Sequence, residues 1–223
     1  AQAHLLHEGV AAVDAPVVGN TVIDALWWMR KRLDGTELDH LGLPSNRMLV
    51  LLTCHRRESQ GRPMRRALDA VAQVAAARAD ELCVVVPVHP NPVVSEAVRD
   101  RLSNVPGVAL VEPLDYRTMV ALLSAGRMVV TDSGGLQEEA PALGLPVLVL
   151  REKTERPEGV AAGGVELVGT DPDAIQRGME RILDSPVSAA VGAECSSPYG
   201  DGLASARVTD ALLGRKPTQF RPE

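Results

Sequence analysis

The run Met128-Val129-Val130-Thr131, followed by Asp132-Ser133-Gly134-Gly135 and then by Leu136-Gln137-Glu138-Glu139-Ala140, decides the fold of this chain. Its first part is a short apolar strand pattern, its middle contains a glycine pair, and its last part has the pattern of a helix. A buried strand that turns through glycines into a helix is the repeating unit of a parallel α/β sheet. We therefore expect further units of the same kind before and after this stretch.

Four more apolar runs have the same character. Each is nearly continuous in Val, Leu, Met or similar residues, as expected for strands that helices cover on both faces. These runs span Met48–Thr53, Leu82–Val88, Val108–Val111 and Val147–Leu150. Amphipathic helical patterns alternate with them, at Thr21–Leu33, Met64–Ala79, Pro92–Leu102, Tyr116–Ala125, Leu136–Leu143, Asp171–Leu183 and Leu203–Leu213. The sequence therefore predicts an α/β fold, with a Rossmann-like parallel sheet and helices on both faces.

The length of 223 residues fits one large domain, or one domain with part of a second. The α/β alternation fills residues 16–184. Before it, residues 1–15 contain one short helical turn, and Asn20 or Thr21 is expected to cap the first helix of the domain. After it, residues 185–213 form a linker and a final helix. We expect the tail, residues 214–223, to be disordered.

Composition excludes several classes of function. The net charge is −6, so no basic face for bulk nucleic acid is expected, and two Trp, two Tyr and one Phe are too few to stack single strands. No apolar run approaches the roughly 20 residues of a membrane span, and the first residues do not read as a signal peptide. Three widely spaced cysteines make neither a disulfide framework nor a zinc pair. We expect a cytoplasmic protein without a metal, a cofactor, a nucleic-acid partner or a membrane partner.

Parallel sheets bind ligands beyond the carboxyl ends of their strands. The first strand is followed by Cys54-His55-Arg56-Arg57-Glu58, in which arginine and histidine suit a phosphate. A solvated loop with an internal Arg–Glu pair would look the same. His89 follows the second strand, but Asn91 and Pro92 just after it have the pattern of a helix start. His89 taken alone therefore reads as a loop residue.

The strongest signal is the Ser133-Gly134-Gly135 turn at a helix start. The free N–H groups there can bind an anion, and the Ser133 hydroxyl adds a donor. A carboxylate from Glu138 or Glu139 can accept from both hydroxyls of a ribose. Together these features indicate a nucleotide, although a helix whose acidic residues are favoured by its dipole would share them. The turn has neither the dinucleotide nor the Walker pattern, and Ser133 lacks the GxSxG context of a nucleophile.

The loop after the fifth strand, Arg151–Glu158, is almost entirely polar or charged. An ordinary charged loop would explain this composition. Its place beside the Ser133 turn favours Arg151 or Arg156 as a contact for an anion.

Taken in order, these motifs resemble the bacterial, non-hydrolysing UDP-N-acetylglucosamine 2-epimerases. The resemblance runs from about residue 5 to residue 213. Its carriers are Gly19–Leu26, Thr53–Ser59, His89–Pro92, Glu112–Tyr116, Thr131–Pro141, Thr154–Glu158 and Pro198–Gly202.

The resemblance implies one half of an enzyme with two Rossmann-like domains in the GT-B arrangement and an active site in the cleft between them. This chain corresponds to the C-terminal half. Residues 1–15 would be a remnant of the N-terminal domain, and the helix Leu203–Leu213 would cross back to it. The implied partners are UDP-N-acetylglucosamine or UDP, the missing N-terminal domain, and a second copy in a homodimer. The implied role is in cell-surface polysaccharide biosynthesis.

The family interconverts UDP-N-acetylglucosamine and UDP-N-acetylmannosamine by eliminating UDP and adding it back. By motif position, His55 would be catalytic at the UDP leaving group. The UDP contacts would be Ser133, Gly134 and Gly135 at the diphosphate, Glu139 at the ribose, Arg156 as a further contact, and Leu114 and Met119 beside the uracil, where the family more often has Gln and Phe. Arg56 and His89 would line a second, regulatory nucleotide-sugar site.

The catalytic carboxylates and the Arg/Lys pair that grips the substrate would lie in the missing N-terminal domain. The resemblance gives Asp115 and Asp132 structural roles, so this chain alone is expected to be inactive. Two other functions stay open: a stand-alone regulatory domain that binds a UDP-sugar, and the nucleotide-binding half of a GT-B glycosyltransferase. The intact His55 and Thr154–Glu158 loops argue against the glycosyltransferase.

Overall fold

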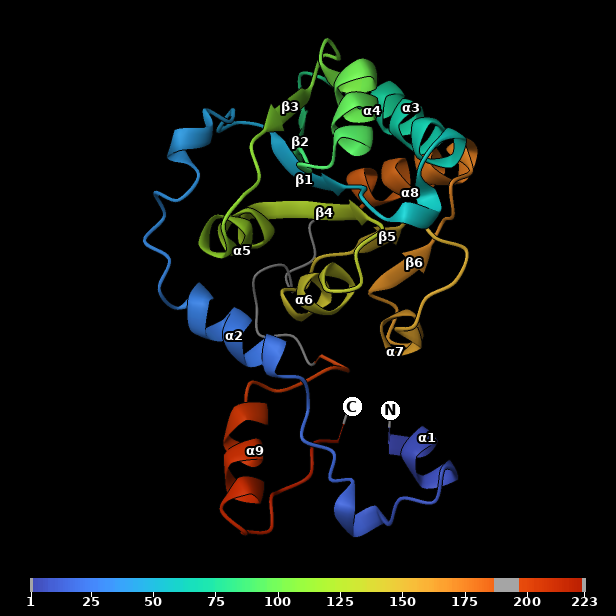
Figure 1. Cartoon of the computed structure of the whole chain (residues 1–223). Coiled ribbons are helices and arrows are strands. Elements are labelled where there is room, and N and C mark those ends of the chain that lie inside the picture. The colour runs from blue at the N-terminus through green and yellow to red at the C-terminus, as the bar shows by residue number, and fades with distance from the viewer. Residues whose placement is uncertain (1, 187–196, 222–223) are drawn as a thin grey trace.

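The computed structural model describes residues 2–186 and 197–221. They contain a six-stranded sheet in the order β3-β2-β1-β4-β5-β6, with all neighbouring strands parallel (Figure 1). This is the Rossmann order, and it places the topological switch point between β1 and β4. The predicted fold class is confirmed. The strands are β1 (Met48–Thr53), β2 (Leu82–Pro87), β3 (Val108–Val111), β4 (Gly126–Thr131), β5 (Val147–Val149) and β6 (Val165–Leu167).

Helices cover both faces of the sheet. One face carries α3 (Arg62–Ala77), α4 (Pro92–Leu102) and α8 (Pro172–Asp184) (Figure 1). The other carries α2 (Thr21–Arg30), α5 (Tyr116–Ala125) and α6 (Leu136–Ala142), with α7 (Pro157–Ala161) beside β6. Short 3-10 turns span Ala12–Asp14, Asp39–Leu41 and Arg57–Ser59.

Alternate strand residues enter two separate cores. On β1, Val50 and Leu52 pack toward α3 and α8, whereas Leu51 packs into the core with α2, α5 and α6. All three side chains are buried. Because both faces of the strand meet apolar layers, the sequence shows a continuous apolar run rather than an alternation.

Side-chain caps fix the starts of three helices. Asn20 accepts from the N–H of Val22 at 3.0 Å, as predicted, and Asn91 caps α4 in the same way. Asp115 accepts from the N–H of Thr118 at 2.8 Å at the start of α5. These caps satisfy N–H groups that a helix leaves without a partner, and they explain why the predicted starts agree with the structure.

The structure differs from the sequence prediction at several short elements. β6 and α7 were not predicted, because three and five residues are too few for a periodic signal. Several predicted elements end one to three residues early: β2 at Pro87, β5 at Val149, α2 at Arg30, α3 at Ala77, α6 at Ala142 and α9 at Leu212.

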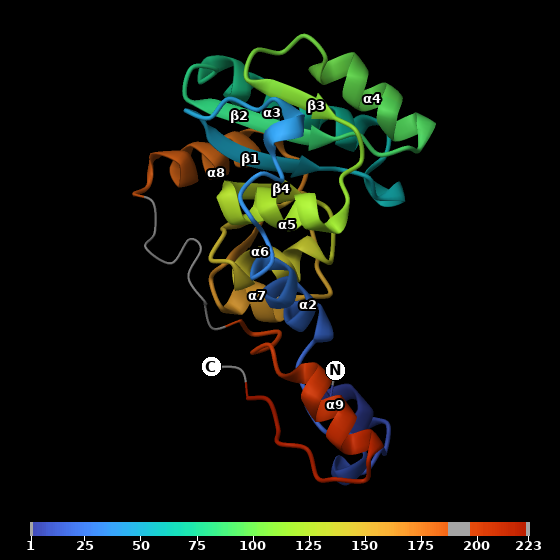
Figure 2. The ribbon, with the colours of Figure 1, turned by 90° about the vertical axis from the view of Figure 1, so that its left-hand side faces the viewer.

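Below the sheet, α1 (Gln2–His7), α9 (Ala204–Leu212) and the tail form a small lower unit (Figure 2). Buried Arg207 of α9 pairs with Asp201, with both N–O distances 2.6 Å, and donates to the Val18 carbonyl at 3.2 Å. In the tail, which was expected to be disordered, Phe220 is buried and its N–H donates to the Val17 carbonyl at 2.8 Å. Tertiary contacts therefore hold this part of the tail without regular secondary structure.

Asp24 of α2 joins the lower unit to the sheet domain. Its carboxylate accepts from the N–H groups of Ala204 and Ser205, at 3.1 and 2.6 Å. α9 has no side-chain cap from its own preceding residue, Leu203. A residue 180 positions earlier in the chain therefore performs the capping.

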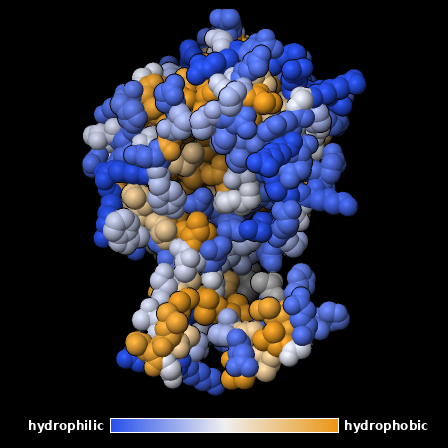
Figure 3. Space-filling model, in the orientation of Figure 1, coloured by the Kyte–Doolittle hydropathy of each residue, from blue (hydrophilic) through white to orange (hydrophobic). Residues whose placement is uncertain are grey.

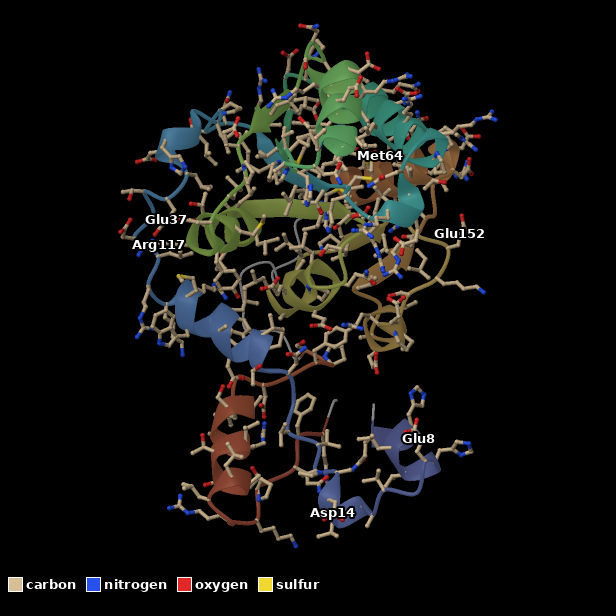
Figure 4. All side chains as sticks on the ribbon, in the orientation of Figure 1. Glu8, Asp14, Glu37, Met64, Arg117 and Glu152 are labelled. Atoms are coloured by element: carbon tan, nitrogen blue, oxygen red, sulfur yellow. The ribbon has the colours of Figure 1, made fainter. Side chains whose placement is uncertain are left out.

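The connector between α2 and β1 is tied to α5. Glu37 and Arg117 point toward one another (Figure 4), and the Glu37 carboxylate accepts from Arg117 Nη2 at 2.6 Å. Arg117 also donates to Asp34 at 2.8 Å. This polar segment is thus anchored beside α5, although it has little regular structure.

Hydrophobic side chains gather on the surface of the lower unit (Figure 3). Among the described residues, no helix combines the length and the apolar character that a bilayer crossing requires. The exposed apolar residues of the lower unit include Leu5, Leu6, Val13, Leu212 and Leu213. Contiguous exposed apolar residues mark surfaces that contact other proteins.

Burial predicts contrasting effects for the same type of substitution, leucine to alanine, in two different helices. Leu68 of α3 is fully buried, so Leu68→Ala should lower the free energy of unfolding by about 2–5 kcal/mol through lost burial and a cavity. Leu212 of α9 is 82% exposed, and Leu212→Ala should change the free energy of unfolding by less than about 0.5 kcal/mol. Urea unfolding of both variants checks this. Equal losses would contradict the burial described for α3.

Candidate functional site

A pocket of about 300 Å³ lies beyond the carboxyl ends of β1, β2 and β4. This is the edge at which parallel sheets bind ligands. The pocket brings together six of the residues singled out in the sequence. They are His55, His89, Leu114, Met119, Ser133 and Glu139.

A buried carboxylate organises the side of the pocket next to β1. Asp132 is fully buried, and its Oδ2 accepts from the N–H groups of His55 and Arg56 at 2.9 and 2.8 Å. Its Oδ1 lies 3.5 Å from Nδ1 of the His55 ring. Burial, and then the nearby charge of Asp132, raise the pKa of the Cys54 thiol. Asp132 thus has the structural role that was expected, and Cys54 is held as an unreactive thiol.

The Ser133 turn begins with a short chain of hydrogen bonds. The hydroxyls of Thr53 and Thr131 are 2.6 Å apart, and Thr131 Oγ1 accepts from the Ser133 N–H at 2.9 Å. Among the described residues, none accepts a hydrogen bond from the Ser133 hydroxyl or from the N–H groups of Gly134 and Gly135. These three donors remain available to a ligand.

Neither backbone strain nor crowding requires glycine at positions 134 and 135. Their φ angles lie outside the left-handed region. A Cβ added at Gly134 would meet nothing within 4 Å, and one at Gly135 would make only ordinary contacts at 3.9 Å. The missing side chains therefore leave open space next to the unpaired N–H groups, as a closely approaching ligand needs.

Glu139 forms the wall of the pocket next to α5. Its Oε1 accepts from the Tyr116 hydroxyl at 2.9 Å. Burial raises the pKa of Glu139, the bond from Tyr116 opposes this, and the charge of Glu138 adds to it. The pKa of Tyr116 is also raised, by burial and then by Glu139. No described residue pairs with the other carboxylate oxygen, so that oxygen can accept from a ligand hydroxyl.

Glu138 points elsewhere and holds Arg156. Its Oε2 accepts from the Asn20 side chain at 2.7 Å, and its Oε1 pairs with Arg156 Nε. Arg156 does not line the pocket described above. Arg156 precedes α7, and Glu138 of α6 holds its guanidinium group. A contact between Arg156 and UDP stays a prediction.

Three side chains were missed in the sequence as parts of this site: buried Gln137 and Tyr199, and the more exposed Tyr116. Gln137 is fully buried and bridges the Ser133 carbonyl, at 2.9 Å, to the Thr154 hydroxyl, at 2.6 Å. Tyr199 accepts from the Gly159 N–H at 2.8 Å and donates to the Arg156 carbonyl at 3.2 Å. No local pattern reveals such partners, because the chain segments that they join are far apart in sequence.

The two residues assigned to a regulatory site are separated. The His89 ring stacks on His55, with centroids 5.4 Å apart, inside the main pocket. Arg56 instead lines a neighbouring pocket of about 480 Å³ with Arg151, where Glu155 lies between the two guanidinium groups. Among the described residues, no group of His, Cys, Asp and Glu is arranged to hold a metal ion.

Comparison with known proteins places these features in a family. The family profile described as UDP-N-acetylglucosamine 2-epimerase matches residues 1–213. A relative from Ralstonia nicotianae, named probable UDP-N-acetylglucosamine 2-epimerase, is 46% identical over 216 residues, which is 94% of this chain and 57% of the relative. The Salmonella typhimurium UDP-N-acetylglucosamine 2-epimerase is 43% identical, with the same two coverages.

A solved structure shows the same relation. The UDP-GlcNAc 2-epimerase from Neisseria meningitidis bound to UDP-GlcNAc is 37% identical and superposes with a TM-score of 0.87, over 96% of this chain and 59% of that chain. The chain thus spans less than two thirds of the length of these relatives, as expected for one half of a two-domain enzyme. On the profile match, the identities and the fold, the chain belongs to the UDP-N-acetylglucosamine 2-epimerase family.

Proposed function

We propose that this chain supplies the UDP-binding half of an enzyme that interconverts UDP-N-acetylglucosamine and UDP-N-acetylmannosamine by elimination and re-addition of UDP. The observation that carries the proposal is the pocket at the β1–β4 switch point, in which unpaired donors, a carboxylate and a histidine converge. Its volume of about 300 Å³ lies at the lower end of the range for small-ligand sites.

Each part of UDP has a matching group in the pocket or at the glycine turn next to it. The diphosphate would accept from the Ser133 hydroxyl and from the N–H groups of Gly134 and Gly135. The ribose diol would donate to the free oxygen of Glu139. Leu114 and Met119, which line the pocket, would give the apolar wall that a uracil ring needs, and His55 would act at the leaving diphosphate.

Of the two buried carboxylates next to the pocket loops, we propose neither as the base for the proton at C2 of the sugar. Asp132 is fully buried behind His55 and Arg56, and Glu139 is bonded to Tyr116. We assign the acid–base carboxylates to the part of the relatives that this chain does not span. The exposed apolar residues of the lower unit, such as Leu212 and Leu213, would contact that part. A homodimer and a cytoplasmic location stay predictions.

Gly134→Ala tests the phosphate cradle. We expect the wild-type chain to bind UDP with a dissociation constant between micromolar and millimolar, or about 4–8 kcal/mol. The new methyl group would occupy the open space beside the unpaired N–H groups, so UDP affinity should fall at least tenfold. Because nothing in the empty protein meets that methyl, the free energy of unfolding should change by less than about 0.5 kcal/mol. Calorimetric titration and urea unfolding give the two readouts. Unchanged UDP affinity would contradict the cradle.

Glu139→Gln separates binding from stability. The variant keeps an oxygen for Tyr116 but loses the charge that receives the ribose, so UDP affinity should fall about tenfold or more. The raised pKa of Glu139 means that its ionised form costs stability, progressively as pH rises from the unfolded pKa through the folded one. At a pH above that interval, the variant should therefore unfold at the same temperature as wild type or higher.

Glu166→Gln, at an exposed residue of β6, is the matched control for Glu139→Gln and should leave UDP affinity unchanged. A Glu139→Gln variant that loses stability but keeps UDP affinity would show a structural role only.

The 223-residue chain alone should not move the proton at C2. When it is incubated with UDP-N-acetylglucosamine in deuterated water, mass spectrometry should find no deuterium at C2, because Asp132 is buried and Glu139 is proposed to receive the ribose. A full-length relative in the same solvent serves as the positive control. Deuterium incorporated by this chain would reveal a base within it and would contradict the assignment of that role to the missing part.

A further inference from the structure

Two imidazole rings stand face to face in the pocket. The rings of His55 and His89 have centroids 5.4 Å apart and planes only 9° apart. Each ring follows a different strand, β1 or β2, and both line the same pocket. A neutral imidazole carries its proton on one nitrogen only, and the hydrogen bond made by one nitrogen decides which. The partners of the two Nδ1 atoms therefore determine what the pair presents to a ligand.

The two Nδ1 atoms face groups of opposite kind. His55 Nδ1 lies 3.5 Å from the Asp132 carboxylate, which can only accept and therefore favours a proton on that nitrogen. His89 Nδ1 accepts from the backbone N–H of Asn91 at 3.1 Å, so that nitrogen keeps its lone pair and the proton sits on Nε2. The two partners require opposite tautomers.

We propose that Asp132 and the Asn91 N–H hold the stacked histidines in opposite tautomers, so that Nε2 of His55 is an acceptor and Nε2–H of His89 is a donor. Asp132 is then a positioning residue for His55. This inference rests on the proposed function only for its use in catalysis. The tautomers themselves are a property of the free chain.

The arrangement has a chemical consequence for the ligand. Because Nε2 of His55 accepts and Nε2–H of His89 donates, the pair suits a ligand group that can both donate and accept, such as a hydroxyl. A fully ionised diphosphate only accepts, so it would meet His89 directly and His55 only after His55 had taken up a second proton. The fixed pair thus distinguishes the two rings by role, although they are the same residue type.

Asp132→Asn gives a test, because one orientation of the new amide keeps the two shorter bonds of the loop. Oδ2 of Asp132 accepts from the N–H groups of His55 and Arg56 at 2.9 and 2.8 Å, whereas Oδ1 accepts only from the His55 N–H, at 3.1 Å. The amide oxygen is therefore expected at the Oδ2 position. The amide nitrogen then replaces Oδ1 and donates toward His55 Nδ1. We expect His55 to switch to the Nε2–H tautomer, and His89 to keep its own.

The tautomers can be read directly by two-dimensional nitrogen–proton NMR on the 223-residue chain with labelled histidine. His55→Asn and His89→Asn variants assign the signals. Wild type should show His55 protonated on Nδ1 and His89 protonated on Nε2. Glu139→Gln, which removes a buried carboxylate from the opposite wall of the pocket, next to α5, is the control and should leave both tautomers unchanged.

The wild-type spectrum decides the proposal even if Asp132→Asn does not fold. His55 protonated on Nε2 in the wild type, or the same tautomer in both rings, would overturn it. A folded Asp132→Asn variant in which His55 keeps its proton on Nδ1 would overturn it too. Failure of the proposed function looks different: the expected tautomers would be present, but UDP would not bind.

Discussion

The buried carboxylate of Asp132 is the contact on which the pocket depends. It directly follows β4, and it accepts from the backbone of His55 and Arg56 directly after β1. A fully buried charge persists only where donors surround it, and here two N–H groups and an imidazole do so. Because β1 and β4 flank the switch point of the sheet, this one contact sets the distance between the histidine loop and the glycine turn. A ligand that touches both loops depends on that distance.

A closed ring of hydrogen bonds connects the pocket edge to the two links with the lower unit. The Asn20 side chain and Arg156 both donate to Glu138, the Tyr199 hydroxyl donates to the Arg156 carbonyl, and the Asn20 N–H donates to the Tyr199 carbonyl at 2.7 Å. Asn20 and Tyr199 lie on the two chain segments that leave the sheet domain. A change in the angle at which those two segments leave the sheet domain would therefore displace Arg156. Through Glu138, it would also displace the helix that begins at the glycine turn.

Much of this architecture could be predicted because its signals are local. Strands buried on both faces are continuous apolar runs, and Asn20 and Asn91 are caps next to the helices they start. The strand-end rule predicts that His55, Ser133 and Glu139 share one edge of the sheet, and all three line the same pocket. Tertiary partners have no such signal. Tyr116 meets Glu139 across 23 positions and Asn20 meets Glu138 across 118, so neither pair leaves a local pattern. The same reason hid the buried Phe220.

The adjacent glutamates show how the fold separates two like charges beside the proposed anion site. Because successive helix residues point in different directions, Glu138 pairs with Arg156 and accepts from the Asn20 side chain, and these two contacts stabilise its charge. Glu139 keeps only a neutral donor, Tyr116, and burial raises its pKa. An uncompensated carboxylate in a pocket is unfavourable until donors arrive. Two ribose hydroxyls are such donors and carry no charge. A nucleotide that places its ribose there, and its phosphates at the glycine turn, satisfies Glu139 while keeping the two negative groups apart.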